Sequence, residues 1–455
     1  MDAVTGVLKQ LTGISEWIML IIIIGGGLFL VGYSRFRPYR HFRHAIGVVS
    51  GKYDKAGETG EVSHFQALAS VVAATVGLGN ISGVAIAIYS GGPGVVFWMW
   101  LTAVLGACIK FYSCGLAVLY REVDDKGQVK GGPMYYMKIA MGRKGKILAV
   151  FFCLAGLFGV LPAFTVNQLT QTIVEVVNPD SFYRLGELKW RLIIGIVLVV
   201  LTSMVIFGGL KKIVRVASAM VPFMVLVYFL SALLIMVLNP GQVWPSVVLI
   251  FREAFDLHTA VQGGFWGLVL LGVQRAVFSN ESGIGNAPMY HGQSRTDEPA
   301  KEGLVAMLGP FIDTIVVCTI TAIIIIISGA HETTETNGIV MTLNAFEKLL
   351  FGYGDILLMV MVFVFALSTL FTYSYYGTKC LTFLGGEKVG KAYNYVYIFS
   401  IIFVAMASVD FVVSLIDLAF ALMAIPNMIA VLWLAPDMNR SMNRYFKKLK
   451  EEKLS

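Results

Sequence analysis

The chain has 455 residues, of which 57% are hydrophobic and only 14% are charged, and its mean hydropathy is +0.76. Soluble globular chains carry about 25% charged residues, so lipid must solvate much of this chain, and we expect an integral membrane protein. The net charge of +7 does not indicate a nucleic-acid partner, because the basic residues lie in short loops between apolar segments.

Apolar segments long enough to cross a membrane recur along the chain, since a spanning helix needs about 20 mostly apolar residues. A basic flank after the first segment (Arg35, Arg37, Arg40) favours a retained helix over a cleaved leader. The expected fold class is an all-α, polytopic membrane protein. The sequence predicts eleven spans, at 14–34, 64–90, 94–120, 146–177, 190–208, 214–238, 262–290, 302–329, 353–384, 392–407 and 410–435.

Lys and Arg in the loops predict the orientation, because cytoplasmic loops are enriched in basic residues. If the 35–60 loop is cytoplasmic and eleven spans alternate, the cytoplasmic stretches hold 26 Lys and Arg and the external ones six. If the span count were wrong by one, every later loop would lie on the opposite side of the membrane, and the difference in Lys and Arg between the two sides would be smaller. We expect a cell-membrane protein with its N-terminus outside and a basic cytoplasmic tail at 436–455.

Two predicted spans are interrupted by small and polar residues near the middle of the membrane. Gly-Leu-Gly-Asn at 77–80, in the second span, recurs as Gly-Ile-Gly-Asn at 283–286, in the seventh. The two sites lie five spans apart and therefore enter the membrane with opposite polarity. This pattern predicts two inverted five-helix repeats, and the expected divisions of the chain are an extra helix and loop at 1–60, the repeats at 61–238 and 239–435, and the tail.

The interruptions are expected to open both helices and to form a binding site. Glycine weakens a helix interior by about 0.8–1 kcal/mol relative to alanine, and unwound backbone is tolerated in a bilayer only where it lines a cavity or is buried in protein. Freed N–H groups suit a carboxylate, whereas freed carbonyls suit an ammonium group or a sodium ion. The alternative is close helix packing through small residues without any ligand.

Further polar residues lie in other spans. The fourth contains Asn167, Gln168 and Gln171, and the ninth contains Ser368 and Thr369 one turn after Phe365. Hydroxyls and freed carbonyls together form the oxygen cage that a hard cation such as sodium needs, by analogy with calcium and magnesium. The same hydroxyls can instead bond a carbonyl of their own helix or a neighbouring helix.

Charged residues inside spans indicate function, because it is costly to place them in a membrane. Glu281 lies in the interrupted seventh span, six residues after Arg275, and either shapes the site or pairs with Arg275. Lys110 and Asp313 lie deeper than most of the other charged residues.

Three motifs resemble signatures of the alanine or glycine:cation symporters, also called sodium:alanine symporters. GLGNISGVA (77–85) resembles the first core-helix signature, GGPGVVFWMWLTAVLG (91–106) is close to the GG…FWMW signature, and FSNESGIGNAP (278–288) is similar to a third. In the third, Ser282 and Asn286 stand where alanine and serine are more usual. The resemblance implies a LeuT-type fold of ten core helices in two inverted halves, preceded here by one extra helix.

The resemblance also implies a site for a small neutral amino acid flanked by two sodium ions. N–H groups around Gly77 and Gly79 would bind the carboxylate, and carbonyls of 278–283 would bind the amino group. The implied substrate residues are Thr75, Gly77, Gly79, Asn80, Gln168, Phe278, Ser279, Asn280 and Gly283. The implied sodium ligands are Thr75, Asn80 and Ser279 for the ion nearest the substrate, and the carbonyls of Ala73, Val76 and Phe365 with the hydroxyls of Ser368 and Thr369 for the other.

The sequence thus predicts a transporter that couples inward sodium flow to uptake of alanine or glycine by alternating access. Glycines at both breaks, Phe278 and the FWMW run predict a small pocket. A proton-coupled carrier of another small solute on the same fold remains an alternative, and a channel is a weaker one. An enzyme is not expected, because the sequence has neither a metal-binding cluster nor a nucleophile elbow. Nothing in the sequence indicates an oligomeric state.

Overall fold

Helices form nearly every element of the protein in the computed structural model, which describes residues 2–125, 127–177, 185–256, 264–332 and 337–452. The α-helices are α1 (Asp2–Tyr33), α2 (Arg37–Arg40), α3 (Phe42–Val49), α4 (His64–Thr75), α5 (Leu78–Gly91), α6 (Val95–Leu119), α7 (Pro133–Gly159), α8 (Ala163–Val177), α9 (Leu185–Ile206), α10 (Gly209–Leu238), α11 (Pro240–Glu253), α12 (Gly264–Asn280), α13 (Ala287–His291), α14 (Pro299–Ala306), α15 (Leu308–Pro310), α16 (Thr319–Ser328), α17 (Ile339–Leu349), α18 (Gly354–Gly385), α19 (Glu387–Ala405) and α20 (Val409–Glu452). A π-helix, η1 (Phe311–Cys318), joins α15 to α16, and a 3-10 turn, η2 (Ala330–Glu332), precedes α17. One short antiparallel hairpin pairs β1 (Glu122–Val123) with β2 (Val129–Lys130).

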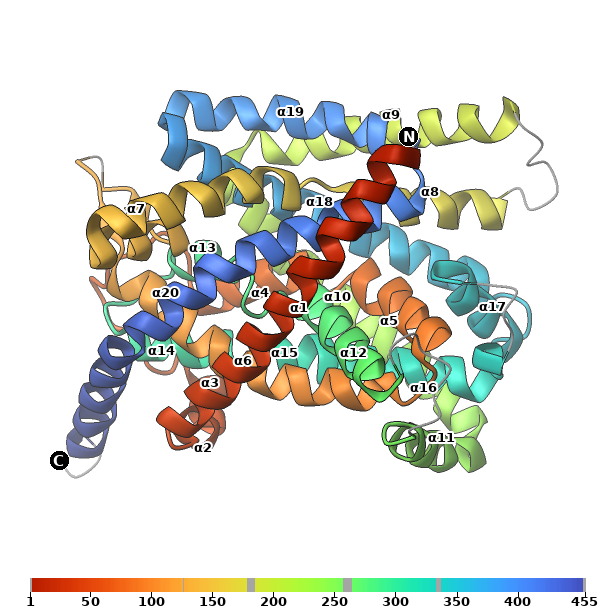
Figure 1. Ribbon diagram of the computed structural model, residues 1–455, viewed down its shortest axis with the longest axis horizontal. Coiled ribbons are helices and arrows are strands. Elements are labelled where there is room, and N and C mark those ends of the chain that lie inside the picture. The colour runs from red at the N-terminus through yellow and green to blue at the C-terminus, as the bar shows by residue number, and fades with distance from the viewer. Residues whose placement is uncertain (1, 126, 178–184, 257–263, 333–336, 453–455) are drawn as a thin grey trace.

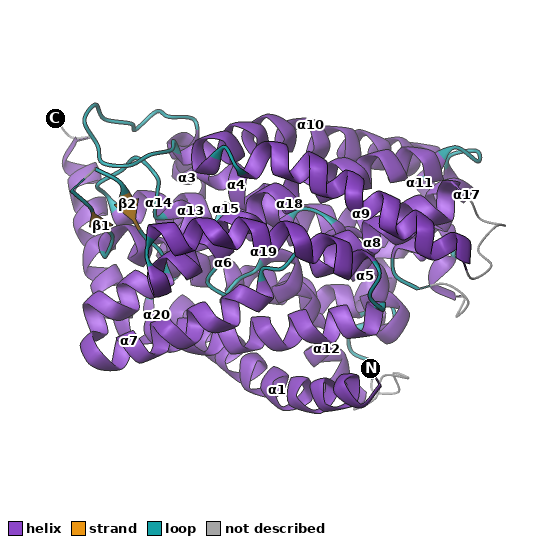
Figure 2. Ribbon diagram, turned by 90° about the horizontal axis from the view of Figure 1, so that it is seen from above, coloured by secondary structure: helices purple, strands orange, loops and turns teal. Residues whose placement is uncertain are grey.

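The long helices run broadly along the longest axis of the molecule, and α1 and α20 pack against each other as they cross one face (Figure 1). The short helices α2 and α3 and the β-hairpin lie toward one end of this axis, and α11 and α17 lie toward the other (Figures 1 and 2). The C-terminus lies at the first end and the N-terminus lies toward the second.

Eight helical segments in the described residues are long and apolar enough to cross a membrane, and the bent pair α4–α5 adds a ninth. The eight are Thr12–Tyr33, Val95–Leu119, Pro133–Val177, Lys189–Ile206, Gly209–Leu238, Pro299–Ser328, Gly354–Gly385 and Phe411–Glu451. This confirms the all-α, multi-pass class, whereas the count of eleven and the inverted repeat stay predictions.

Two predicted spans, 262–290 and 392–407, are absent from this set. Residues 262 and 263 lie outside the described part of the chain, and α12, which starts at Gly264, has only 17 residues because it ends at the interruption. α19 begins with the charged turn Glu387–Lys391, which lowers its hydropathy. Both segments are therefore weaker candidates by length or composition than the other nine.

The first interruption separates α4 from α5, and the two helices meet at an angle of 41°. A capping box between Ser63 and Gln66 fixes the start of α4, and the helix ends where Val76 turns to extended backbone. Gly77 follows with φ of −172° and ψ of −144°. A Cβ at Gly77 would stand 3.0 Å from the Thr369 hydroxyl oxygen, a tight contact, so α18 approaches the chain closely here.

The second interruption separates α12, which ends at Asn280, from α13, which begins at Ala287. Glu281, Gly283 and Gly285 all have positive φ values, of 53°, 85° and 104°. Glycine adopts this left-handed region freely, whereas a glutamate there is strained and must be held by its surroundings. Both helix breaks predicted from the sequence are confirmed.

The start of α4 is tied to α13 and α14 by a buried polar cluster. The Glu302 carboxylate bonds the imidazole Nδ1 atoms of both His64 and His291, the latter at 2.5 Å. All three side chains are 2% exposed or less. The cluster therefore connects the outer ends of both broken helices to the same carboxylate.

Candidate functional site

A small cavity lies beside the break between α4 and α5. Its free volume is about 20 Å³, which is room for about one or two water molecules. Six helices or the residues beside them supply its walls: α4, α5, α8, α12, α18 and α20. The lining residues are Ala74, Thr75, Gly77, Leu78, Gly79, Leu161, Phe164, Thr165, Phe278, Thr369, Tyr373, Ile416 and Phe420.

Three aromatic rings close one side of this cavity. The Phe278 ring meets the Phe164 ring edge-on, with centroids 4.8 Å apart, and lies 5.8 Å from the Phe420 ring. The guanidinium carbon of Arg275 stands 5.7 Å from the centre of the Phe278 ring. Arg275 also forms an ion pair with Asp417 at 3.2 Å, so a charged pair lies beside the aromatic cluster.

The start of α5 borders the cavity at Gly77, Leu78 and Gly79. The first N–H groups of a helix have no carbonyl of a preceding turn to bond, and they carry the positive end of the helix dipole. A Cβ at Gly79 would lie 3.4 Å from the Phe278 ring. The Phe278 ring therefore lies close to the backbone at the start of α5.

Hydroxyls of α18 meet carbonyls of α4 next to this break. The Ser368 hydroxyl lies 3.0 Å from the Ala73 carbonyl and 2.8 Å from the Phe365 carbonyl, and the Thr369 hydroxyl lies 3.2 Å from each. The structure thus brings together four of the five residues predicted for one ion. Within the described contacts, neither hydroxyl bonds the carbonyl of Val76, the fifth residue.

Thr75 and Asn80, predicted for the other ion, both bond Asp313 of η1. The Thr75 hydroxyl lies 2.8 Å from the Asp313 carboxylate and 2.9 Å from the Val71 carbonyl. The Asn80 amide donates to the Asp313 backbone carbonyl at 2.8 Å, and its oxygen accepts from the Gly77 N–H at 3.3 Å. Asp313 was recognised in the sequence only as a deeply placed charge.

Ser279 and Asn280, at the end of α12, meet Thr314, the next residue of η1. The Asn280 amide donates to the Thr314 hydroxyl at 2.9 Å. The Ser279 hydroxyl lies 3.4 Å from the Thr314 hydroxyl and 3.2 Å from the Cys318 sulfur. The π-helix thus connects the two broken helices, and no sequence signal identified Thr314.

Several residues predicted for the substrate do not line the cavity. Gln168 accepts a bond from the Ser82 hydroxyl at 2.5 Å, and Thr165, one turn earlier, lines the cavity instead. The Gly283 carbonyl accepts from the Asn427 amide at 2.7 Å. The other predicted substrate residues outside the lining are Asn80, Ser279 and Asn280, whereas Thr75, Gly77, Gly79 and Phe278 belong to it.

Glu281 bonds Tyr373 and not Arg275. The Tyr373 hydroxyl donates to the Glu281 carboxylate at 2.5 Å, while Arg275 pairs with Asp417. Since Tyr373 lines the cavity, this contact joins the second helix break to the cavity wall. Of the two roles that the sequence left open for Glu281, the structure favours shaping the site.

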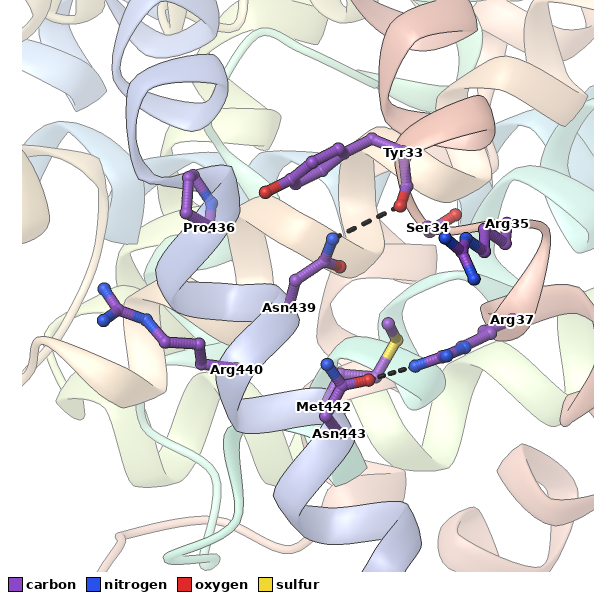
Figure 3. A pocket seen from close by; sticks show the side chains of 9 residues that line it. All are labelled: Tyr33, Ser34, Arg35, Arg37, Pro436, Asn439, Arg440, Met442 and Asn443. Atoms are coloured by element: carbon purple, nitrogen blue, oxygen red, sulfur yellow. Dashed lines mark hydrogen bonds between the residues drawn. The ribbon is translucent and has the colours of Figure 1, made fainter.

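A much larger cleft, of about 630 Å³, lies where the end of α1 meets α20 (Figure 3). The Asn439 amide donates to the Tyr33 carbonyl at 3.4 Å, and Arg37 donates to Asn443. The cleft is lined by none of the residues of the helix breaks. It is therefore a poorer candidate than the small cavity for the site that the interrupted helices form.

Long apolar helices around two broken helices and a small cavity define a polytopic membrane protein. The solved structures that share this fold include MhsT in complex with L-phenylalanine (TM-score 0.56, 14% identity, covering 85% of this chain and 100% of that one) and MHP1, a nucleobase-cation-symport-1 family transporter (TM-score 0.51, 13% identity, 86% and 96%). The likeness confirms the predicted overall transporter fold, whereas the two inverted halves and the count of spans stay predictions.

The chain belongs to the sodium:alanine symporter family, whose family model matches residues 1–455. The sodium/alanine symporter AgcS of Methanococcus maripaludis is 38% identical over 422 residues, which are 92% of this chain and 91% of that protein. The family predicted from the three motifs is confirmed. The protein is a transporter of a sodium-coupled amino-acid symporter family and, as predicted, not an enzyme.

Proposed function

We propose that this protein couples inward sodium flow to the uptake of alanine or glycine by alternating access. The small cavity between the start of α5, Phe278 and Thr369 carries this proposal. At this cavity, the N–H groups at the start of α5, the aromatic rings around Phe278, and the hydroxyls and carbonyls between α4 and α18 lie close together. The name of the relative AgcS, a sodium/alanine symporter, supports the same substrate.

The size of the cavity favours the smallest amino acids. Its free volume of about 20 Å³ is less than any amino acid needs, so the walls must move when a substrate binds. Phe164, Phe278 and Phe420 supply most of the aromatic wall, and a small side chain requires the smallest displacement of these rings. The same fold accommodates L-phenylalanine in MhsT, so this selectivity would come from the local side chains.

In the bound state, the substrate carboxylate meets the N–H groups around Gly77 and Gly79, and Phe278 packs over the ligand. The carbonyls of 278–283 receive the amino group. The lining positions of Gly77, Gly79 and Phe278 support this orientation. Carbonyls freed at the second break support the role of 278–283, and substrate-induced rotation of that segment would bring them to the cavity.

One sodium ion binds between α4 and α18, with the carbonyls of Ala73, Val76 and Phe365 and the hydroxyls of Ser368 and Thr369. The hydroxyls now donate to the carbonyls, at 2.8–3.2 Å. An ion between them would replace these bonds, and the hydroxyl protons would turn away so that every oxygen faces the cation.

The second sodium ion binds near the substrate, with Thr75, Asn80 and Ser279 as ligands. Their convergence on neighbouring residues of η1 supports this assignment. Because both ions contact α4 or α5, sodium binding would stabilise one arrangement of the broken helix and complete the carboxylate site. The two halves would then rock and open the opposite gate.

The proposed topology has eleven spans, an outside N-terminus and a cytoplasmic C-terminus. The separation of the termini along the molecule and the strong excess of Lys and Arg in alternate loops both support it. Labelling of single cysteines introduced near each terminus of the protein in intact cells tests this orientation. Labelling of the C-terminal cysteine by an impermeant reagent would contradict it.

Uptake by purified protein in liposomes tests the function. An inward sodium gradient should drive accumulation of radiolabelled alanine or glycine, and an excess of either should compete better than leucine or phenylalanine. A proton gradient imposed without sodium should drive no accumulation. Uptake driven by protons alone, or a preference for large amino acids, would contradict the proposal, and flux without accumulation would indicate a channel.

A further inference from the structure

Three buried charged side chains lie next to the proposed site of the sodium ion nearest the substrate, and each has a polar atom without a hydrogen-bond partner in the described residues. Lys110 of α6, Glu281 of the second break and Asp313 of η1 are 1%, 2% and 0% exposed. The Lys110 ammonium, one oxygen of Glu281 and one oxygen of Asp313 have no hydrogen-bond partner in the described part of the chain. Buried charges in a membrane protein are costly, so incomplete pairing at three neighbouring positions needs a physical reason.

One face of α6 brings these groups together. A Cβ at Gly106 would meet the Ser282 side chain at 2.5 Å, so this part of α6 lies against the second break. One turn later, the Lys110 ammonium lies 3.2 Å from the Cβ position of Gly309, and Gly309 precedes Asp313 by four residues. Lys110 therefore lies between the segments that carry the two carboxylates.

The charges of this group do not balance when both carboxyl groups are ionised. Two carboxylates and one ammonium, each in its usual ionised form, have a net charge of −1. Arg275 does not compensate, because it pairs with Asp417. Lys110 forms no ion pair within 4.0 Å in the described residues, so neither carboxylate is neutralised by direct contact. One monovalent cation would restore neutrality.

The unpartnered oxygen of Asp313 belongs to a set of oxygen ligands. Its other carboxylate oxygen lies 2.8 Å from the Thr75 hydroxyl oxygen. That hydroxyl has an alternative acceptor, the Val71 carbonyl at 2.9 Å. If the Thr75 proton turns to Val71, the Thr75 oxygen and the Asp313 carboxylate can both face a cation. Sodium is a hard cation that suits such ligands.

We propose that the Asp313 carboxylate is a direct ligand of the sodium ion nearest the substrate, beside Thr75. This inference rests on the proposed function and adds a charged ligand that neither the motifs nor the comparisons indicate. The π-helix η1 places the side chain of Asp313 and that of Thr314 toward opposite broken helices. Single π-helical turns are frequent at functional sites. The ion would thus neutralise the buried group and link α4, α5 and η1.

Sodium-dependent stabilisation of the purified full-length protein tests this inference. Thermal unfolding is followed over a series of sodium chloride concentrations, with choline chloride keeping the ionic strength constant. In Asp313→Asn, the sodium concentration for half-maximal stabilisation should rise about 10- to 100-fold, because a charged ligand is lost. Asp355→Asn is the matched control, since Asp355 lies in the first turn of α18, and its sodium response should equal that of the wild type.

A second measurement covers the case in which Asp313→Asn does not fold. Asp313→Glu keeps the charge but moves the carboxylate by one methylene, and it should also raise the sodium requirement for stabilisation and for binding of radiolabelled alanine. An unchanged sodium requirement in whichever variant folds, with a sodium-dependent wild type, would overturn the role of Asp313 alone. Alanine binding by the wild type that is equally strong in choline chloride would overturn both this inference and the proposed sodium coupling.

Discussion

Replacing Thr369 by valine tests the ion site between α4 and α18. Valine has nearly the shape of threonine but lacks the hydroxyl, which now lies 3.2 Å from the carbonyls of both Ala73 and Phe365. The hydroxyl has one proton to donate, and the carbonyls that accept it are backbone carbonyls of helices. Its loss should therefore lower the free energy of unfolding by only about 0.5–1.5 kcal/mol. A bound sodium ion, by contrast, loses an oxygen ligand.

The effect on sodium binding should be larger than the effect on folding. An interaction with a charged group contributes about 1.5–3 kcal/mol, and each 1.4 kcal/mol changes an affinity tenfold. The sodium concentration for half-maximal alanine uptake should therefore rise about 10- to 100-fold in Thr369→Val. The assay is radiolabelled alanine uptake into proteoliposomes at increasing external sodium, with the amount of inserted protein measured in parallel.

Thr372→Val provides the matched control on the same helix. Among the residues that the structure describes, the Thr372 hydroxyl bonds only carbonyls of α18, those of Ser368 at 2.8 Å and Thr369 at 3.2 Å. This variant undergoes the same chemical change one turn away and should keep the sodium dependence of the wild type. Equal sodium dependence in Thr369→Val and the wild type would refute the assignment of Thr369 as a ligand.

Three further predictions concern the cavity and the polar contacts around it. Gly79→Ala should abolish saturable alanine binding, because the added Cβ would occupy the carboxylate side of the cavity. The unfolding temperature should stay nearly unchanged, because this Cβ would make only an ordinary 3.4 Å contact with Phe278. Equilibrium binding and thermal unfolding check these two results. Tyr373→Phe should lower the free energy of unfolding by about 1.5–3 kcal/mol, since it removes the bond to the buried Glu281 carboxylate, and an unaltered denaturation curve would contradict that bond. Glu302→Gln should lower the free energy of unfolding by about 3–5 kcal/mol and lower the unfolding temperature at neutral pH, because it removes the charge that joins His64 to His291. A variant as stable as the wild type would show that this cluster does not hold α4 and α13 together.

The sequence predicted the helix breaks well because their cause is local. Glycines at 77 and 79, and at 283 and 285, weaken a helix wherever they stand in it. The first break contains Gly77, with Gly79 in the first turn of α5, and the second contains Gly283 and Gly285. Hydropathy also predicted the long spans, because the bilayer requires about 20 apolar residues whatever surrounds them. The sequence therefore predicted the features that depend only on local composition, namely the helix breaks and the long spans.

The walls of the cavity were not predictable in the same way. Phe164, Tyr373 and Phe420 come from three helices, and nothing in the local sequence separates them from the many other aromatic residues of the core. The π-helix η1 was also missed, because its extra residue per turn arises from packing and has no local signature. Gln168 is an example: it has the expected polar side chain and lies in the expected helix, but Thr165, one turn away, lines the cavity instead.

The departure at Ser282 from the usual family motif can be interpreted from its position. Its side chain lies against Gly106 of α6, where a Cβ would come within 2.5 Å of the serine hydroxyl, and it does not line the cavity. A serine in place of alanine therefore changes the contact between the second helix break and α6, where only glycine leaves enough room. We infer that this departure affects how the break packs, whereas selectivity among small amino acids depends on Gly79 and the Phe278 ring, which border the cavity directly.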